Sequence, residues 1–436
     1  MSLVDLSPEA FASHLLSLGV RRAYAVFDAR TQRLELSHPE LGDLREFLTG
    51  NNRDFDQHEG VFLEVGERSG ALFGAFVHRS NRGQGQGGLR HWPYGTLAAF
   101  LRDGLRLARG MTRKNALAGL WWGGGKGLIA RVPGEGHRDL AIRATLYSEY
   151  ARFVTSLRGC YITAEDAGTG PEDMAVVHQF TRFVTCVPPS IGGSGNPSPA
   201  TAHGVVCAME GALDHLGLGT LEGKKVVMQG TGNVATAMIG ELLQRKVGAI
   251  VASELSLERR VALSKLFAGA AVALVPAQAG DNSILAEPCD ILAPNALGGI
   301  LNPDTVPTIQ ARIVCGAANN QLLDDVRDAQ ALADRGIVYV PDYLCNRMGI
   351  VHCANEQYGQ IPDDPAITRH FGHEWDNSVY VITRRALELA AQHNITTAAA
   401  ANRLADELAT AQHPIWGHRT QAIIDGLIAD RWHLGG

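Results

Sequence analysis

A glycine-rich turn in the middle of the chain constrains the fold most strongly. Residues 224–235 read KKVVMQGTGNVA, an apolar run that leads into a GxGxxA motif and then into helical spacing. In a strand–turn–helix unit, Gly230 permits the tight turn, Gly232 lets the backbone approach a pyrophosphate, and Ala235 keeps the helix close to the sheet. Free backbone N–H groups at the helix start bind the phosphates. The motif therefore predicts a dinucleotide site formed by Gly230, Thr231, Gly232, Asn233 and Val234.

An acidic residue supports this interpretation. Glu254 ends the next apolar run, 24 positions after Gly230. A carboxylate there can accept hydrogen bonds from both ribose hydroxyls and would repel a 2′-phosphate, so we expect NAD rather than NADP. The alternative is a glycine-rich turn in an unrelated α/β protein. That alternative does not explain why a strand precedes the turn, a helix follows it and an acidic residue ends the next strand.

Six short apolar runs alternate with helical segments beyond residue 199 and predict a doubly wound parallel sheet. The runs are 225–228, 249–252, 271–275, 290–293, 313–315 and 337–340. Residues 188–199, PPSIGGSGNPSP, have the composition of a linker. We expect an α/β protein of two domains with a cleft between them: residues 1–195 plus 372–436, and a Rossmann domain over 196–371.

Composition excludes several classes of protein. With 39 basic and 45 acidic residues the net charge is −6, so no nucleic-acid partner is expected. No apolar run approaches the roughly 20 residues of a membrane helix, so no membrane partner is expected either. The seven cysteines are odd in number, and their spacing matches no metal site. Free thiols, a reducing cytoplasm and no metal are the expectation.

Two lysines and an aspartate are candidates for chemistry. Lys126 follows three glycines and the pair Trp121–Trp122, which we expect to be shielded from solvent. Desolvation depresses a lysine pKa and makes the residue useful as a base or as a cation that polarises a carbonyl. Lys114 lies twelve positions earlier. Asp166 stands between an apolar run and a predicted helix from Pro171; it is either a proton carrier or a helix cap.

Six motifs in order carry a resemblance to a known family. They are RLARGMTRKNA (106–116), GGGKG (123–127), TAEDAGT (163–169), SGNPSP (194–199), APNALG (293–298) and GAANNQL (316–322). The chain resembles the glutamate/leucine/phenylalanine/valine dehydrogenases from about residue 73 to residue 355, and is most similar to their leucine dehydrogenase-like branch. The resemblance implies reversible deamination of an L-amino acid to its 2-oxo acid and ammonia, with NAD as cofactor. It also implies a homo-oligomer that assembles through the first, substrate-binding domain.

The resemblance implies a role for each candidate residue. Lys114 would bind the substrate α-carboxylate, Lys126 would polarise the reacting carbon and activate water, and Asp166 would carry protons to and from the amino group. Asn320 would contact the substrate near the nicotinamide. Ala296 and Asn319 are implied to contact the cofactor.

In this family, the residue before GGLR (87–90) helps to determine which substrate side chain fits the pocket. Glutamate-specific members have a lysine where this chain has Gln86, which is followed by Gly87 and Gly88. A substrate carboxylate without its cation in a desolvated pocket is unfavourable, so glutamate is disfavoured. The other implied pocket residues, Ala164, Ile350 and Cys353, are small or apolar. We expect a neutral amino acid, branched-chain ahead of aromatic, although Gln86 could also bind an indole N–H or an amide.

Two departures from the family pattern keep alternatives open. Arg347 and Met348 replace small residues, and Arg347 could contact a cofactor phosphate or a substrate acid, or obstruct the site. Trp121–Trp122 also replaces smaller residues. The alternatives are a glutamate-type dehydrogenase, a dehydrogenase of an unusual amino acid, and a catalytically silent sensor of NAD or an amino acid. The sensor is disfavoured because binding alone needs no proton carrier.

Overall fold

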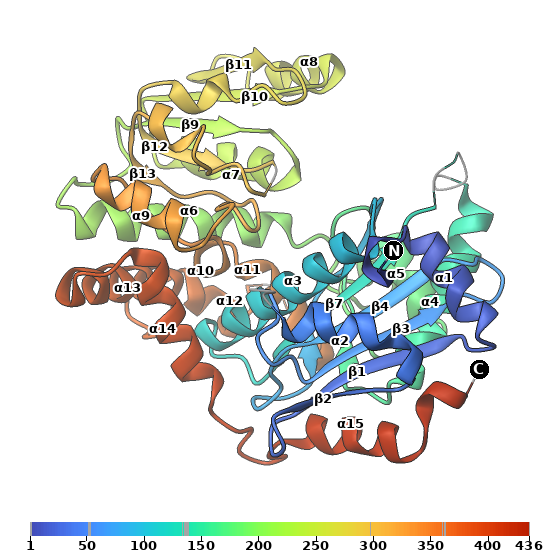
Figure 1. The fold of residues 1–436 in the computed structure, drawn as a ribbon. Helices are drawn as coiled ribbons and strands as arrows, with labels where there is room; N and C mark the ends of the chain where they lie inside the picture. The colour runs from blue at the N-terminus through green and yellow to red at the C-terminus, as the bar shows by residue number, and fades with distance from the viewer. Residues whose placement is uncertain are drawn as a thin grey trace.

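Two sheets form two domains in the computed structural model (Figure 1), which describes residues 2–50, 54–132, 134, 139–296, 298–359, 361 and 363–435. The first is an eight-stranded sheet of order β2-β1-β3-β4-β7-β5-β8, with β6 paired to β7. The second is a six-stranded sheet of order β11-β10-β9-β12-β13-β14. Within the described ranges, no helix has both the length and the apolar character needed to cross a membrane.

The first sheet is mixed. Neighbouring pairs from β2 to β7 are antiparallel, whereas β5, β6 and β8 run parallel to their partners. Short apolar strands bounded by turns build it. Their bounds are β1 (Arg22–Asp28), β2 (Arg33–Leu36), β3 (Gly60–Val65), β4 (Leu72–Val77), β5 (Gly85–Gln86), β6 (Leu89–Trp92), β7 (Gly123–Ala130) and β8 (Tyr161–Ile162).

Helices cover both faces of this sheet because alternate residues of a strand point to opposite sides. On β4, Phe73 packs with α4 (Leu140–Ser156), α5 (Pro171–His178) and α15 (Arg419–Ala429). Phe76, three positions further along β4, packs with α1 (Pro8–Ser17), α2 (Gly42–Thr49) and α3 (Leu97–Leu117). The Ser7 hydroxyl caps α1 by accepting from the Ala10 N–H. All eight residues of the central strand β7 are buried between the two layers.

Glycines in β7 let α3 approach the sheet. A Cβ at Gly124 would lie 2.0 Å from Thr112 Oγ1 and 2.4 Å from the Ala108 carbonyl oxygen of α3. A Cβ at Gly127 would lie 2.1 Å from the Tyr150 hydroxyl on the other face. The strand therefore carries one long side chain between its glycines, that of Lys126.

The second domain confirms the six strands expected from the sequence, and every pairing in it is parallel. The chain winds from β9 outward to β11, then returns and winds from β12 to β14, so the order reverses between β9 and β12. Ligands of such sheets bind at this reversal, beyond the carboxyl ends of the strands. The elements are α6 (Ser198–His215), β9 (Lys225–Gln229), α7 (Asn233–Gln244), β10 (Ala249–Glu254), α8 (Leu257–Leu266), β11 (Val272–Pro276), β12 (Cys289–Pro294), β13 (Ala311–Val314), α9 (Arg327–Asp334) and β14 (Val338–Tyr339).

The C-terminal segment contacts both sheets. Helices α13 (Val379–His393) and α14 (Thr397–Ala409) share a hydrophobic core with α6 and the parallel sheet. Helix α15 returns to the first sheet and lies below β1 and β2 in Figure 1. Three short helices lie between β14 and α13 in the sequence: α10 (Asp342–Cys345), α11 (Met348–Ala354) and α12 (Pro365–Thr368). The domain boundaries expected from the sequence stay a proposal.

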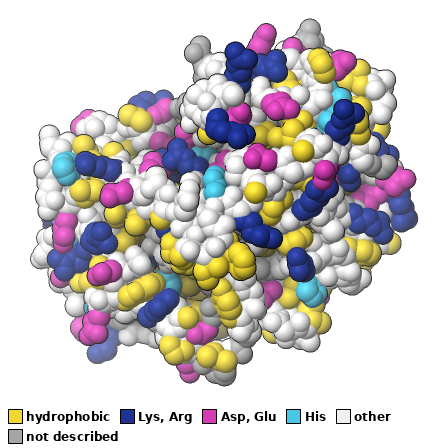
Figure 2. All heavy atoms as spheres, turned by 90° about the horizontal axis from the view of Figure 1, so that it is seen from below, with side chains coloured by type: hydrophobic (Ala, Val, Ile, Leu, Met, Phe, Trp, Pro, Cys, Tyr) yellow, Lys and Arg dark blue, Asp and Glu magenta, His cyan; other side chains and the backbone are white. Residues whose placement is uncertain are grey.

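Charged side chains of both signs are interspersed over the face shown in Figure 2, and hydrophobic side chains gather near its centre.

Candidate active site

Almost all the expected substrate residues line one cavity of about 220 Å³ between the two domains. The first domain contributes Gln86, Gly88, Lys114, Lys126, Ala164 and Asp166; the second contributes Val234, Asn319 and Asn320; α11 contributes Ile350 and Cys353. Gly87 lies between two lining residues, and its carbonyl accepts a hydrogen bond of 2.7 Å from the Tyr161 hydroxyl. The cavity thus joins residues that are far apart in the sequence.

Close backbone approach brings these segments together. A Cβ at Gly87 would lie 1.8 Å from the Gly125 carbonyl oxygen, and one at Gly88 would lie 2.4 Å from the Glu165 carbonyl oxygen. Only glycine fits at such contacts. The segment 86–88 can therefore run beside Lys126 and beside the residues that follow β8.

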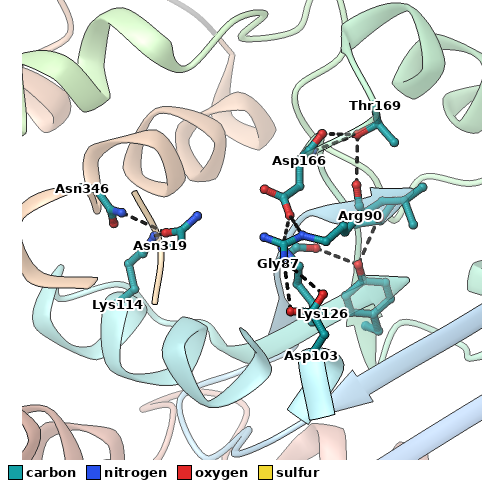
Figure 3. A network of polar contacts seen from close by, with 12 residues as sticks. Gly87, Arg90, Asp103, Lys114, Lys126, Asp166, Thr169, Asn319 and Asn346 are labelled. Atoms are coloured by element: carbon teal, nitrogen blue, oxygen red, sulfur yellow. Dashed lines mark hydrogen bonds and ion pairs between the residues drawn. The ribbon is translucent and has the colours of Figure 1, made fainter. Parts of the chain in front are cut away.

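Lys126 and Asp166 form an ion pair at one side of the cavity (Figure 3), with 2.6 Å between Nζ and Oδ2. Arg90 Nε lies 3.1 Å from the same oxygen, and Arg90 Nη1 lies 3.0 Å from both carboxylate oxygens of Asp103. Burial would raise the pKa of Asp166, but Lys126 and Arg90 outweigh it and hold that pKa below its usual range. Burial lowers the pKa of Lys126 despite its partner. The site holds an ionised carboxylate next to a lysine that releases its proton more readily than usual.

Asp166 is not a helix cap. Helix α5 begins at Pro171 with Gly170 as its N-cap residue, four positions beyond Asp166. The Asp166 carboxylate is directed to the two cations instead. This arrangement removes the capping alternative and leaves the carboxylate facing the cavity.

Glu165 is a site residue that sequence reasoning missed. It lines the cavity beside Asp166. Burial, together with the negative charges of Asp166 and Asp173, raises the pKa of Glu165 to about 7. Its place directly before Asp166 was the available signal. Arg90 was also missed as a site residue, although it closes the GGLR motif.

Lys114 faces the cavity from the other side, at the end of α3 (Figure 3). Its Nζ donates to Asn319 Oδ1 at 3.4 Å, and Asn346 Nδ2 donates to the same oxygen at 2.9 Å. Among the described residues no carboxylate lies within ion-pair distance of Lys114, and burial lowers its pKa. A partly buried ammonium group without an ion-pair partner is suited to bind an anionic group of a ligand.

Gln86 presents an unpaired amide. Its side chain is fully buried, and among the described residues neither Nε2 nor Oε1 has a hydrogen-bond partner. The neighbouring cavity residues Ala164 and Ile350 are apolar. Because an unpaired buried amide is unfavourable, a ligand that hydrogen-bonds to Gln86 is favoured.

The glycine-rich turn between β9 and α7 fits a dinucleotide. Gly230 has φ +89°, and a Cβ there would lie 2.8 Å from the Cβ of Ala296. Gly232 is the N-cap residue of α7, and a Cβ there would meet no atom within 4 Å, so the space before the helix is open. Val234 at the start of α7 and Asn319, which follows β13, both line the cavity.

Glu254 ends β10 beside this turn. Its carboxylate accepts hydrogen bonds from Thr231 Oγ1 at 2.5 Å and from the Ser256 N–H at 2.9 Å. Burial would raise the pKa of Glu254, but these bonds and Arg259 hold it below its usual value. Arg259 Nε lies 3.8 Å from Glu254 Oε2 and donates to the Thr231 carbonyl. No sequence motif pointed to this arginine.

The expectations for Cys353, Arg347 and Met348 need correction. Cys353 is not a free thiol, because Cys186 and Cys353 form a disulfide. Arg347 does not reach the cavity: it is fully buried and donates to the carbonyls of Leu117 and Asn377. Met348 packs in the core that contains α6.

The two tryptophans differ in their exposure to solvent. Trp122 is buried against Ile350 and Ala354 behind the cavity. Trp121 is 42% exposed, with the Arg82 guanidinium 4.3 Å from its ring centroid, so the expected shielding is confirmed for Trp122 and wrong for Trp121. Lys126 owes its burial to the sheet and not to Trp121.

Comparisons with known proteins agree with this geometry. The family model described as Glutamate/Leucine/Phenylalanine/Valine dehydrogenase matches residues 192–413. The model described as Glu/Leu/Phe/Val dehydrogenase, dimerisation domain, matches residues 67–183.

Individual relatives are similar over most of their length. The chain is 38% identical to a leucine dehydrogenase of Geobacillus stearothermophilus, over 81% of this chain and 90% of the relative. It is 37% identical to a valine dehydrogenase of Streptomyces coelicolor, over 80% and 92%. The crystal structure of the L-tryptophan dehydrogenase of Nostoc punctiforme has a TM-score of 0.64 and 33% identity, over 81% of this chain and 96% of that one. The chain therefore belongs to the glutamate/leucine/phenylalanine/valine dehydrogenase family, as an amino acid dehydrogenase of its leucine dehydrogenase-like branch.

Proposed function

We propose that this enzyme catalyses the reversible, NAD-dependent oxidative deamination of a neutral L-amino acid to its 2-oxo acid and ammonia. One observation carries the proposal: Lys114, Lys126 and Asp166 face a single cavity that the dinucleotide-binding domain also borders. Their placement supplies a cation for a carboxylate, a cation for a reacting carbon and a proton acceptor. A protein that only binds an amino acid would need only the cation for the carboxylate.

Each side chain has a role in this proposal. Lys114 binds the α-carboxylate, which gives its ammonium group the ion-pair partner that it lacks. Lys126 polarises the reacting carbon and activates the water that adds to the imine, and its depressed pKa suits acceptance of a proton from that water. Asp166 accepts a proton from the amino group because Arg90 and Lys126 keep its carboxylate ionised. Asn320 contacts the substrate on the cofactor side.

The cofactor assignment is NAD. The NAD nicotinamide would accept the hydride. We assign the pyrophosphate to the turn, the ribose to Glu254, and further cofactor contacts to Ala296 and Asn319; the turn residues are Gly230, Thr231, Gly232, Asn233 and Val234. Arg259 partly offsets the charge of Glu254, yet the carboxylate still disfavours a 2′-phosphate. We expect kcat/KM with NAD to exceed that with NADP by about tenfold, equivalent to ~1.4 kcal/mol; equal values would contradict the role of Glu254.

Branched-chain amino acids are the first candidate substrates. Ala164 and Ile350 give the side-chain end of the cavity an apolar wall, and Gln86 supplies no cation for a glutamate side chain. The unpaired amide of Gln86 favours a second candidate: a neutral side chain with its own hydrogen-bonding atom, such as an indole. A relative named L-tryptophan dehydrogenase, 36% identical over 76% of this chain, is consistent with this candidate.

A substrate panel separates the candidates. Initial rates are measured for each standard L-amino acid with NAD, for the native enzyme and for Gln86→Leu. If Gln86 binds a side-chain polar atom, the leucine variant loses about tenfold or more in kcat/KM for tryptophan while keeping that for leucine. A native preference for glutamate, or turnover of no amino acid, would contradict the proposed function.

Assembly and location are also proposals. We propose a homo-oligomer, because the matched dimerisation-domain model covers part of the first domain and large hydrophobic side chains such as Leu140 and Tyr358 are exposed. Light scattering tests this, and a monomer would contradict it. We propose a cytoplasmic location, which the five free cysteines support.

A further inference from the structure

A single disulfide lies in the wall of the substrate cavity. Cys186 and Cys353 are 167 positions apart in the sequence, and both line the cavity that holds Lys114, Lys126 and Asp166. Together with Ala164 they form a small apolar cluster at its surface. A molecule small enough to enter the cavity can therefore reach this bond.

The bond joins two walls that carry substrate-facing residues. On one side, the Thr185 N–H donates to the Thr163 carbonyl at 2.9 Å, so Cys186 is held beside the segment that continues into Ala164 and Asp166. On the other side, Cys353 lies on α11, about one turn after Ile350. The disulfide thus sets the separation between α11 and the residues that follow β8.

The remaining cysteines argue against a structural disulfide framework. Cys160, Cys207, Cys289, Cys315 and Cys345 are all free. None of them lines the cavity. Disulfides in proteins that otherwise keep their thiols reduced are typically transient and redox-sensing.

We propose that Cys186 and Cys353 form a reversible redox site that sets the enzyme's affinity for its amino acid. A thiolate of a small dithiol attacks one sulfur, the Cys186–Cys353 bond breaks, and a mixed disulfide forms with the attacked cysteine. The second thiol of the reagent then displaces that cysteine. Two electrons and two protons pass from the dithiol to the cysteine pair, and the reagent becomes a disulfide. A small disulfide oxidant reverses the reaction.

Neighbouring contacts keep the effect local. Glu356 Oε2 accepts hydrogen bonds from the N–H groups of Cys186 and Ser194, both at 2.8 Å, and His352 Nε2 lies 2.8 Å from the Ser194 carbonyl oxygen. These contacts hold the segment 186–194 against the end of α11 when the disulfide opens. The Lys126–Asp166 ion pair contains neither cysteine. Reduction therefore loosens the side-chain end of the cavity and raises KM, while kcat changes little.

Thiol counting tests the site itself. Protein treated with a disulfide oxidant, then denatured and labelled with a maleimide, should show five reactive thiols, and protein treated with dithiothreitol should show seven. In the reduced, folded enzyme, a neutral amino acid should slow alkylation of Cys186 and Cys353 by about threefold or more, because it fills the cavity beside them. Seven thiols after oxidant treatment, or no protection, would overturn the proposal.

Kinetics test the consequence for catalysis. The kinetic and protection readouts rest on the proposed function, whereas thiol counting does not. Reduction should raise KM for the preferred amino acid by about threefold or more and change kcat less than about twofold. The double variant C186A/C353A should show one KM in both conditions, whereas Cys289→Ala, outside the cavity, should respond like the native enzyme. A response retained in the double variant, or none in the native enzyme, overturns the inference. If no amino acid is turned over, the proposed function fails while thiol counting still decides whether the redox site exists.

Discussion

Two adjacent carboxyl groups at the cavity have opposite pKa shifts. Lys126 and Arg90 keep Asp166 ionised, whereas burial and the charge of Asp166 itself raise the pKa of Glu165 to about 7. Neighbouring titratable groups with pKa values driven apart are typical of sites that move protons. The pKa shifts differ because the two side chains point to different neighbours. The Asp166 carboxylate contacts two cations, whereas the Glu165 carboxyl group faces two negative charges.

The role of Asp166 can be tested by an isosteric change. Asp166→Asn keeps the size of the side chain but removes the proton acceptor, so kcat for oxidative deamination should fall by about 10²–10⁴-fold. NAD binding, measured by fluorescence titration, should stay unchanged because the residue lies away from the glycine-rich turn. Near-native turnover in this variant would show that the carboxylate has only a structural role.

Glu165 should make stability depend on pH. Its pKa is raised in the folded state, from 4.5 to about 7, so its stabilising contribution is complete below the unfolded pKa and is lost as pH rises through about 7. Glu165→Gln has no such loss. After a discount for its partial exposure, the variant should exceed the native enzyme by about 1–2 kcal/mol in free energy of unfolding near pH 8.5 and match it near pH 4.5. Urea unfolding at both pH values checks this, and a difference that is independent of pH would contradict it.

At the scale of elements, the turn from β9 to α7 depends on the conformation of a single glycine. Gly230 has φ +89° and its α-carbon faces Ala296, whereas Gly240 sits inside α7 with open space around it. Gly230→Ala should lower the free energy of unfolding by about 2 kcal/mol or more and weaken NAD binding. The matched control Gly240→Ala should instead raise it by about 0.5–1 kcal/mol, because alanine is the better helix former. Equal effects in thermal unfolding would contradict this account.

At the scale of the whole molecule, the chain's end returns to its first sheet. Trp432 is buried against Phe62 and Phe153, and its Nε1 donates to Ser156 Oγ at 2.9 Å. Trp432→Ala should cost about 3–5 kcal/mol of unfolding free energy. The exposed Trp416 offers a control, since Trp416→Ala should stay within about 0.5 kcal/mol. Comparable losses in denaturant unfolding would show that Trp432 does not anchor the end of the chain to the first sheet.

The elements that sequence reasoning predicted well are those with local causes. The six strands of the second domain follow from short apolar runs, and the turn before α7 follows from the positions of Gly230 and Gly232. Strands β5 and β8 have only two residues each, too few for a pattern of alternation. The first sheet could therefore not be assembled from the sequence, although its residues were expected to form an α/β domain.

The sequence by itself determined the dinucleotide turn, the parallel sheet and the candidates Lys114, Lys126 and Asp166, because glycine conformation, apolar periodicity and motif spacing are properties of neighbouring residues. Only the tertiary structure decided what distant segments do to one another. It joined Cys186 to Cys353, placed Arg90 between Asp103 and Asp166, and buried Arg347 against backbone carbonyls instead of in the cavity. Contacts of this kind depend on distances between elements, and residue order along the chain does not contain those distances.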